Sequence, residues 1–204
     1  MKRIDLVRGV GINDTGQAVT KYKFWYDRGK RRQRIVWRCP AYTVWNNMLA
    51  RCYDERVTNN HPSYSDVKVD ERWHLFSNFK QWWFDNYVDG WHLDKDILSD
   101  DNGKVYGPDT CCFIPKVLNN FLTNTKGAKG YTERSSGRFQ VFCSDPISGK
   151  VTSHGTFDTE EEAALTYHFV KHSRLLQLLV MYPSIDTRVA DKFKSIFLTA
   201  KELQ

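Results

Sequence analysis

The sequence predicts an α+β protein in which a strand–loop–strand–helix segment is followed by a three-stranded antiparallel sheet packed on a helix. Three observations predict this fold. Apolar stretches and a polar loop alternate as a ββα unit between residues 93 and 122. Short β-type stretches over 138–143 and 150–157, with a turn between them, follow a small polar linker. A capping box, Thr159 to Glu162, then opens a helix directly after the last stretch.

The first 38 residues are expected to form a basic, β-rich extension. Residues 19–26 are β-branched and aromatic, Asp27–Lys30 forms a turn, and Arg34–Arg38 returns as a second strand. This region holds eleven Lys and Arg against three acidic residues. We expect it to contact nucleic-acid phosphates, although a charged edge hairpin that resists aggregation and a simple solubility bias remain alternatives. The expected contacts are Lys30, Arg31, Arg32 and Arg34.

Residues 39–125 form the next predicted region, which is acidic, with eight Lys and Arg against twelve Asp and Glu. Pro40 suits the first position of a helix, and the helical spacing from Ala41 to Cys52 predicts a buried face. A second amphipathic helix is expected from Asp70 to Asn86. Its aromatic stripe is interpreted as core, and consists of Trp73, Phe76, Phe79 and Trp83.

The ββα unit lies at the end of this region. Residues 93–98 are expected to form its first strand and residues 105–114 its second, with a polar loop between them. Pro115 is expected to start a short helix. Two carboxylates, Asp94 and Asp96, therefore lie on the first strand, and Asn119 lies one turn into the helix.

Residues 126–180 are predicted to form a separate sheet-and-helix domain, followed by a terminal helix over 181–204. Alternation over 138–143 directs Phe139, Val141 and Cys143 to one face and leaves Arg138, Gln140 and Phe142 on the other. The helix that opens at the capping box is expected to reach about residue 180. Pro183 then interrupts it.

The cysteines and the apolar content indicate the compartment. Five cysteines without a CxxC pair argue against a disulfide framework and a four-cysteine zinc site. Cys52, Cys111, Cys112 and Cys143 are expected to be small core residues, and none of the five is expected to be a nucleophile. The first residues show no apolar signal core, and no apolar run is long enough to span a membrane. We expect a cytoplasmic protein, in the host cytoplasm if it is phage-encoded. No membrane partner and no small-molecule cofactor are expected.

One segment of about fifty residues resembles the DNA-binding domain of plant ethylene-response factors, the APETALA family. The resemblance rests on Gly130-Tyr131, Gly137-Arg138-Phe139, Gly155-Thr156-Phe157 and the acidic start of the helix at 160–164. In that family the sheet lies in the DNA major groove. The resemblance implies double-stranded DNA as the partner. The tryptophan and arginine contacts of plant members are largely absent here, so base preference does not carry over. The outward candidates are Arg134, Arg138, Gln140, Ser144 and Ser153.

The middle region resembles the HNH endonucleases of phages and homing elements. The resemblance rests on Trp45, Met48, Arg51-Cys52-Tyr53, Trp73, Phe79, Leu93-Asp94-Lys95-Asp96, Tyr106-Gly107-Pro108, Cys111 and Asn119. In that family a ββα-metal module holds one divalent metal on the scissile phosphate, and a strand histidine deprotonates the attacking water. The resemblance implies that Asp94 and Asn119 bind the metal. Lys95 stands where the catalytic histidine is expected, and Thr110 stands where a middle asparagine is usual.

Asp94, Asp96 and Asn119 form a coherent set of hard oxygen ligands for Mg²⁺ or Mn²⁺. His92 and Asp96 are expected on the same strand face as Asp94. A lysine with an ordinary pKa is protonated at pH 7 and cannot act as a base, so the base could be a water on the metal, Asp96 or His92. In the alternative interpretation, Asp94 and Asp96 cap turns and bridge to Lys95 or Arg72, and the scaffold is catalytically degenerate.

These features together favour a metal-dependent DNA endonuclease of the phage HNH or homing type. A DNA-binding protein that kept the nuclease scaffold without its chemistry is the alternative, as a regulator or a factor in phage–host conflict. A protein inhibitor that uses the aromatic N-terminal region is a third possibility. The recognition sequence, nicking as opposed to double-strand cutting, and the oligomeric state stay open.

Overall fold

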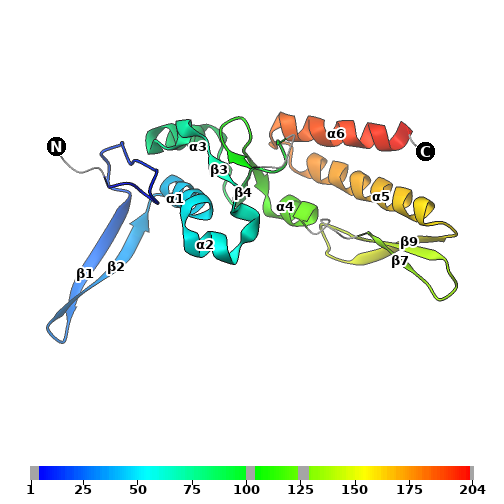
Figure 1. The fold of residues 1–204 in the computed structure, drawn as a ribbon, viewed down its shortest axis with the longest axis horizontal. Coiled ribbons are helices and arrows are strands. Elements are labelled where there is room, and N and C mark those ends of the chain that lie inside the picture. Colours follow the sequence, from blue (N-terminus) through cyan, green and yellow to red (C-terminus); the bar gives the residue numbers. More distant parts are fainter. Residues whose placement is uncertain (1–4, 100–103, 124–128, 203–204) are drawn as a thin grey trace. The chain divides into compact units, whose positions relative to one another are not determined.

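The structure is a computed structural model that describes residues 5–99, 104–123 and 129–202 (Figure 1). The chain divides into two units. The first comprises Met1–Val88 and Lys95–Cys112, and the second comprises Asp89–Asp94 and Phe113–Gln204. Helices and strands are mixed in both units, so the predicted α+β class is confirmed. Within the described ranges, no helix combines the length and the apolar character needed to cross a membrane.

The first unit begins with the predicted hairpin, β1 (Thr20–Asp27) and β2 (Lys30–Arg38), which pair antiparallel. Arg28 and Gly29 join the strands with φ values of 48° and 76°. Positive φ at both central residues defines the type I′ turn, whose twist matches that of two antiparallel strands. Every residue of the hairpin from Lys21 to Arg38 is exposed, so it rests on no other described element (Figure 1).

The core of the first unit forms between α1 (Pro40–Tyr53) and α3 (Phe76–Asn86). Trp45 is fully buried, and its indole N–H donates to the Trp73 carbonyl at 2.7 Å. The Trp45 ring lies 5.2 Å from that of Phe76, between ring centroids. The predicted aromatic stripe therefore packs as core.

The predicted start of the second helix at Asp70 is wrong. Asp70 caps a short 3₁₀ turn, Glu71–Trp73, and α3 begins only at Phe76. The reason lies in the backbone of the N-terminal segment, because Ile12 N–H donates to the His74 carbonyl at 2.8 Å and Phe76 N–H donates to the Ile12 carbonyl at 2.9 Å. These bonds hold Leu75 extended between the turn and the helix.

The remaining elements of the first unit are short. They are α2 (Glu55–Asn60), a 3₁₀ turn (Pro62–Tyr64), β3 (Lys68–Val69) and β5 (Val105–Tyr106). β3 and β5 pair parallel, and Tyr106 is buried.

The strand boundaries of the predicted ββα unit differ from those observed. Its first strand is β4 (Trp91–Asp94), which ends before Asp96. The predicted second strand divides into β5 and β6 (Cys112–Pro115) because the chain turns between them, where Cys111 N–H donates to the Gly107 carbonyl at 2.9 Å. Pro115 ends β6, and the helix α4 starts at Lys116 (Lys116–Thr123). β6 pairs with β4, and α4 contacts β4, so a strand–strand–helix unit exists with shorter strands than expected.

The three-stranded sheet of the second unit matches the prediction. β7 (Tyr131–Glu133), β8 (Phe139–Ser144) and β9 (Val151–Phe157) pair antiparallel in that order. α5 (Glu160–Met181) covers one face, and the capping box of Thr159 and Glu162 fixes its start. Val141 and Cys143 of β8 pack on Ala163 and Tyr167 of α5, which confirms the expected alternation.

α6 (Thr187–Glu202) packs on α5, with Val189 and Phe193 buried.

Two cations of α5, Lys171 and Arg174, are also buried. Lys171 is 8% exposed, and its ammonium donates to the Phe121 carbonyl of α4 at 2.8 Å. The same nitrogen lies 3.5 Å from the centre of the Phe121 ring. Burial lowers the pKa of Lys171 to about 8.

Gly130 offers a test of how tightly the sheet packs on α5. Its φ is +76°, and a Cβ placed there would lie 2.1 Å from the Tyr167 ring. Gly137 has nearly the same φ, +74°, but open space around it. We expect Gly137→Ala to lower the free energy of unfolding by about 1 kcal/mol through backbone strain alone. Gly130→Ala should lower it by a further ~1–3 kcal/mol from the steric overlap, as urea denaturation of both variants would show. Equal losses would mean that Tyr167 does not pack as described.

Lys171 gives the chain a pH-dependent stability. An unfolded lysine titrates near 10.5, whereas folded Lys171 titrates near 8. Between these values the unfolded chain keeps a proton that the folded chain has released, so stability rises with pH across this window. The unfolding free energy of the parent should therefore rise relative to that of Lys171→Met between pH 7.5 and pH 10, as measured by urea denaturation. A constant difference would contradict this assignment.

Candidate nucleic-acid interface and metal site

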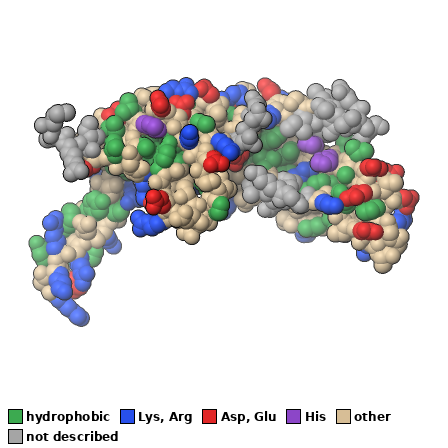
Figure 2. Space-filling model, in the orientation of Figure 1, with side chains coloured by type: hydrophobic (Ala, Val, Ile, Leu, Met, Phe, Trp, Pro, Cys, Tyr) green, Lys and Arg blue, Asp and Glu red, His purple; other side chains and the backbone are tan. Residues whose placement is uncertain are grey.

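The hairpin cations predicted to meet phosphates are all exposed. Lys30, Arg31, Arg32 and Arg34 lie on β2, and Figure 2 shows Lys and Arg side chains together with hydrophobic ones along the hairpin. Arg32 is 3.9 Å from Asp27, a pair exposed enough to contribute little to stability. The hairpin therefore presents dense positive charge to solvent.

Three of the five predicted sheet contacts come together on the face of the sheet that α5 leaves uncovered. The Arg134 guanidinium donates to the Gln140 side-chain carbonyl, and the Gln140 amide donates to the Ser153 hydroxyl at 2.9 Å. Gln140 lies next to the register shift between β8 and β9. The result is a hydrogen-bonded row of one cation, one amide and one hydroxyl across the sheet.

The side chains of the other two predicted sheet contacts bond or pack outside this row. The Arg138 guanidinium donates to the Asp158 carboxylate at 2.7 Å and to the Thr156 carbonyl at 3.1 Å. Ser144 pairs with Val151 at the far end of β8 and lines a cavity of about 470 Å³ with Lys116, Asn120 and Asp145 among other residues. Ser144 thus lies at the other end of β8, whereas Arg138 borders the Arg134–Gln140–Ser153 row, because its backbone carbonyl accepts a hydrogen bond from the Arg134 N–H at 2.8 Å.

Arg174 supports the sheet from the α5 side, a role that the sequence analysis missed. It is buried, and its guanidinium donates to the Cys143 carbonyl at 2.8 Å and to the Thr152 hydroxyl at 2.7 Å. His154 lies 3.2 Å from the same group. Desolvation and the Arg174 charge lower the pKa of His154, in that order. The helical spacing of Lys171 and Arg174 with the apolar residues of α5 was the available signal for their burial.

The two residues that the HNH resemblance assigns to the metal lie in the same unit. Asp94 ends β4 and is partly buried, and Asn119 lies on α4, which contacts β4. His92 is exposed on β4, two residues before Asp94, and strand alternation places both on one face. The side-chain oxygens of Asp94 and Asn119 suit Mg²⁺ or Mn²⁺.

Asp96 does not extend this face, which corrects the expected strand register. β4 ends at Asp94, and Lys95–Leu98 bends away from strand geometry. Asp96 and Lys95 belong to the first unit, where the Lys95 ammonium lies 2.5 Å from an Asp96 carboxylate oxygen. Lys95 is 8% exposed, with its nitrogen 5.8 Å and 5.7 Å from the rings of Tyr64 and Tyr106.

This pair matches part of the alternative interpretation, in which Asp96 bridges to Lys95. The other expected bridge, to Arg72, has different partners, because Arg72 donates to Asp70 and Asp109, each at 2.7 Å. Among the residues that the structure describes, no group of three or more His, Cys, Asp and Glu side chains is placed to hold a metal. Among the described residues, an ion held by Asp94 and Asn119 would thus be bound by one carboxylate and one amide.

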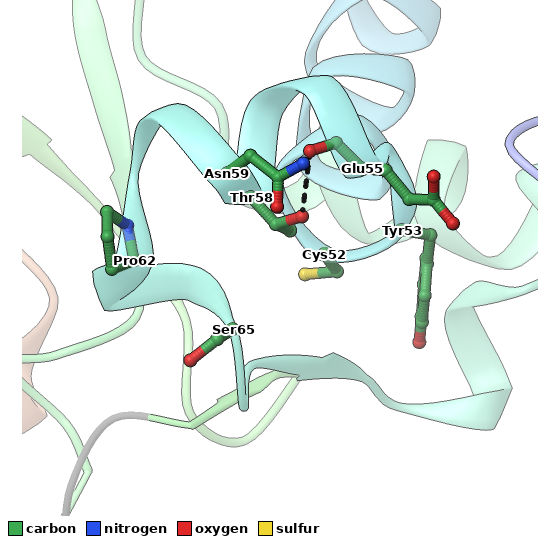
Figure 3. A pocket seen from close by; sticks show the side chains of 7 residues that line it. All are labelled: Cys52, Tyr53, Glu55, Thr58, Asn59, Pro62 and Ser65. Carbon is green, nitrogen blue, oxygen red and sulfur yellow. Dashed lines mark hydrogen bonds between the residues drawn. The ribbon is translucent and has the colours of Figure 1, made fainter.

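The cysteines behave as core residues. Four of the five are buried, and the fifth, Cys39, is partly buried. Cys52 borders a pocket of about 400 Å³ beside α2, where Thr58 donates to the Glu55 carbonyl at 3.2 Å (Figure 3). Burial raises the pKa of the Cys52 thiol to about 11, so it stays protonated at neutral pH. The pocket therefore offers no thiolate nucleophile at Cys52.

Comparison of the chain with protein-family models, with curated proteins and with solved structures found no match.

Proposed function

We propose that this chain binds double-stranded DNA through the uncovered face of the β7–β8–β9 sheet, and that its β4–β6–α4 segment hydrolyses phosphodiester bonds as an HNH-type endonuclease. The observation that carries the binding part is the row of Arg134, Gln140 and Ser153 on a sheet whose other face is closed by α5. Amide and guanidinium groups are the side chains that read base edges in a major groove, which admits β-structure. Side chains of these two kinds on the uncovered face therefore support DNA as the partner of the sheet.

The support for hydrolysis is the placement of Asp94 and Asn119 on contacting elements. A bound Mg²⁺ or Mn²⁺ would polarise the scissile phosphate and stabilise the charge that develops on it. Asp94 and Asn119 would hold and orient that ion. His92, exposed on the same face as Asp94, is the residue positioned to accept a proton from the attacking water. Asp96 has no part in this proposal, because Lys95 engages its carboxylate.

A second candidate function is DNA binding without hydrolysis. Lys95 favours it, because a lysine stands at the position of the expected catalytic base, and it is buried against two tyrosines and paired with Asp96. A side chain held in this way cannot take the place of a free imidazole. In this reading the scaffold positions DNA for another purpose, such as regulation.

A plasmid assay separates the two functions. We expect the chain to nick or cut supercoiled DNA in Mg²⁺ or Mn²⁺, and Asp94→Ala and Asn119→Ala to slow this reaction about 100-fold or more through loss of metal-assisted charge stabilisation. Asp85→Ala, which removes an exposed carboxylate from α3, is the matched control and should cut at the parent rate. If the parent shows no cleavage and calorimetry detects no Mn²⁺ binding while DNA still binds, the second candidate is correct.

Sequence reading by the sheet is tested separately. After selection of a preferred duplex from a random pool, Gln140→Ala should weaken binding to it by roughly 1–3 kcal/mol and change binding to a scrambled duplex much less. Gln177→Ala removes an exposed amide from α5 and serves as the control. Titrations of both duplexes by fluorescence anisotropy give these differences. An equal loss on the two duplexes would show that Gln140 contacts the backbone and not a base.

A further inference from the structure

The pairing of β1 with β2 gives the hairpin two chemically different faces. In an antiparallel pair, residues directly opposite each other have side chains on the same face, and neighbours along a strand alternate. Lys23 is opposite Arg34, Trp25 opposite Arg32, and Asp27 opposite Lys30. These six residues therefore share one face. Their strand neighbours occupy the other.

A bulge brings a second tryptophan to that face. Lys21 is opposite Trp37 while Tyr22 is opposite Ile35, so Val36 has no partner in the register. Without the extra residue, alternation would place Trp37 with Ile35. The Lys21 ammonium lies 5.3 Å from the centre of the Trp37 ring, as residues on one face should. We call this the cationic face; it consists of Lys21, Lys23, Trp25, Asp27, Lys30, Arg32, Arg34 and Trp37.

The opposite face is mixed, because it carries Thr20, Gln33 and Arg38 beside its aromatic residues. Tyr22 and Phe24 lie on it with ring centroids 6.2 Å apart, together with Tyr26 and Ile35. Arg31 belongs to this face, and its guanidinium lies 4.2 Å from the centre of the Phe24 ring. Arg31 is thus separated from Arg32 and Arg34, with which the sequence analysis had grouped it.

We propose that the cationic face binds a single-stranded stretch of DNA, with its Lys and Arg on phosphates and with Trp25 and Trp37 stacked on bases. This inference rests on the proposed function for DNA as the partner, and it assigns a separate strand type to the hairpin. Five cations against one carboxylate are complementary to a phosphate backbone. Alternate residues along a strand lie about 6.6 Å apart, so the cations form two rows that can follow a backbone.

The tryptophans select a single strand over a duplex. Trp25 and Trp37 are 42% and 41% exposed on a hairpin that nothing else in the described chain covers. Bases inside a duplex are already stacked on their neighbours, whereas an unpaired base can stack on an exposed indole. Cations beside exposed aromatic rings are the combination by which single strands are bound without base preference.

Neighbouring positions on β2 provide a matched charge test. With the full chain and fluorescein-labelled dT20 at 0.1 M salt, Arg32→Gln should weaken binding about fivefold and flatten the slope of log affinity against log salt by about 0.7, the loss of one phosphate contact. Arg31→Gln removes the same charge from the opposite face and should change neither quantity. Equal losses for the two variants would overturn the assignment of the faces.

The aromatic residues provide the second arm. Trp25→Leu and Trp37→Leu should each weaken dT20 binding about fivefold or more, and a blunt 20-base-pair duplex much less. Tyr26→Leu, on the face opposite the cationic face and 75% exposed, should leave both affinities unchanged. If the tryptophan variants bind dT20 like the parent, the inference is wrong. Circular dichroism of each variant shows whether the chain still folds.

The outcomes separate this inference from the proposed function. Duplex binding that depends on Gln140, together with dT20 binding indifferent to the cationic face, would overturn the inference alone. A parent that binds neither DNA would overturn both. Binding to vesicles of 30% phosphatidylserine but not to dT20 would identify an anionic membrane surface as the partner, and so would also overturn the inference.

Discussion

The packing of β8 on α5 is the contact on which the candidate DNA-reading surface depends. Val141 and Cys143 can reach Ala163 and Tyr167 only if alternate residues of β8 point to the helix. The same alternation sends Gln140 to the outer face, where it meets Arg134 and Ser153. The face of the sheet toward α5 is therefore apolar, and the outer face, which meets water, carries the polar row. A substitution that weakened the packing of β8 on α5 would therefore also disturb the Arg134–Gln140–Ser153 row, although it would alter none of these three residues.

Buried cations extend this constraint beyond apolar packing. Arg174 and Lys171 reach from α5 to backbone carbonyls of Cys143 and Phe121, on β8 and α4 respectively. A charge taken out of water is tolerated when it is hydrogen-bonded, and costs several kcal/mol when it is not. These two side chains therefore fix which part of α5 faces the sheet and which part faces α4. Within the second unit, the helix links the sheet to the strand–strand–helix segment.

Local chemistry made much of the fold predictable. Pro40, the Thr159–Glu162 capping box and the alternation of β8 each act over a few residues, and each prediction is confirmed. The wrong predictions involve partners distant in the chain. Leu75 is held extended by Ile12, and the stretch from Val105 to Ile114 divides because β5 pairs with β3 and β6 with β4. The residue pattern within those segments does not indicate which distant strand or residue each segment will pair with.

The candidate metal residues show the same limit. Alternation predicted that Asp94 and Asp96 share a face, but β4 ends between them, and Asp96 pairs with the buried Lys95. When the length of a strand is unknown, alternation predicts the direction of a side chain reliably only near the centre of the strand, because residues near its end can lie outside it. The hairpin register is likewise invisible in the sequence, because a single unpaired residue, Val36, decides where Trp37 lies.

The tip of the hairpin has a thermodynamic consequence. Arg28 adopts φ 48° in a turn where asparagine or glycine is usual, and for an arginine this conformation costs about 1–2 kcal/mol. A two-stranded ribbon with no layer beneath it is at best marginally stable. The stability of the paired strands and the affinity of the hairpin for a polyanion therefore depend on each other. A ligand that neutralises the crowded cations stabilises the paired strands, and part of its binding free energy is spent on ordering them, which lowers the affinity that its contacts alone would give.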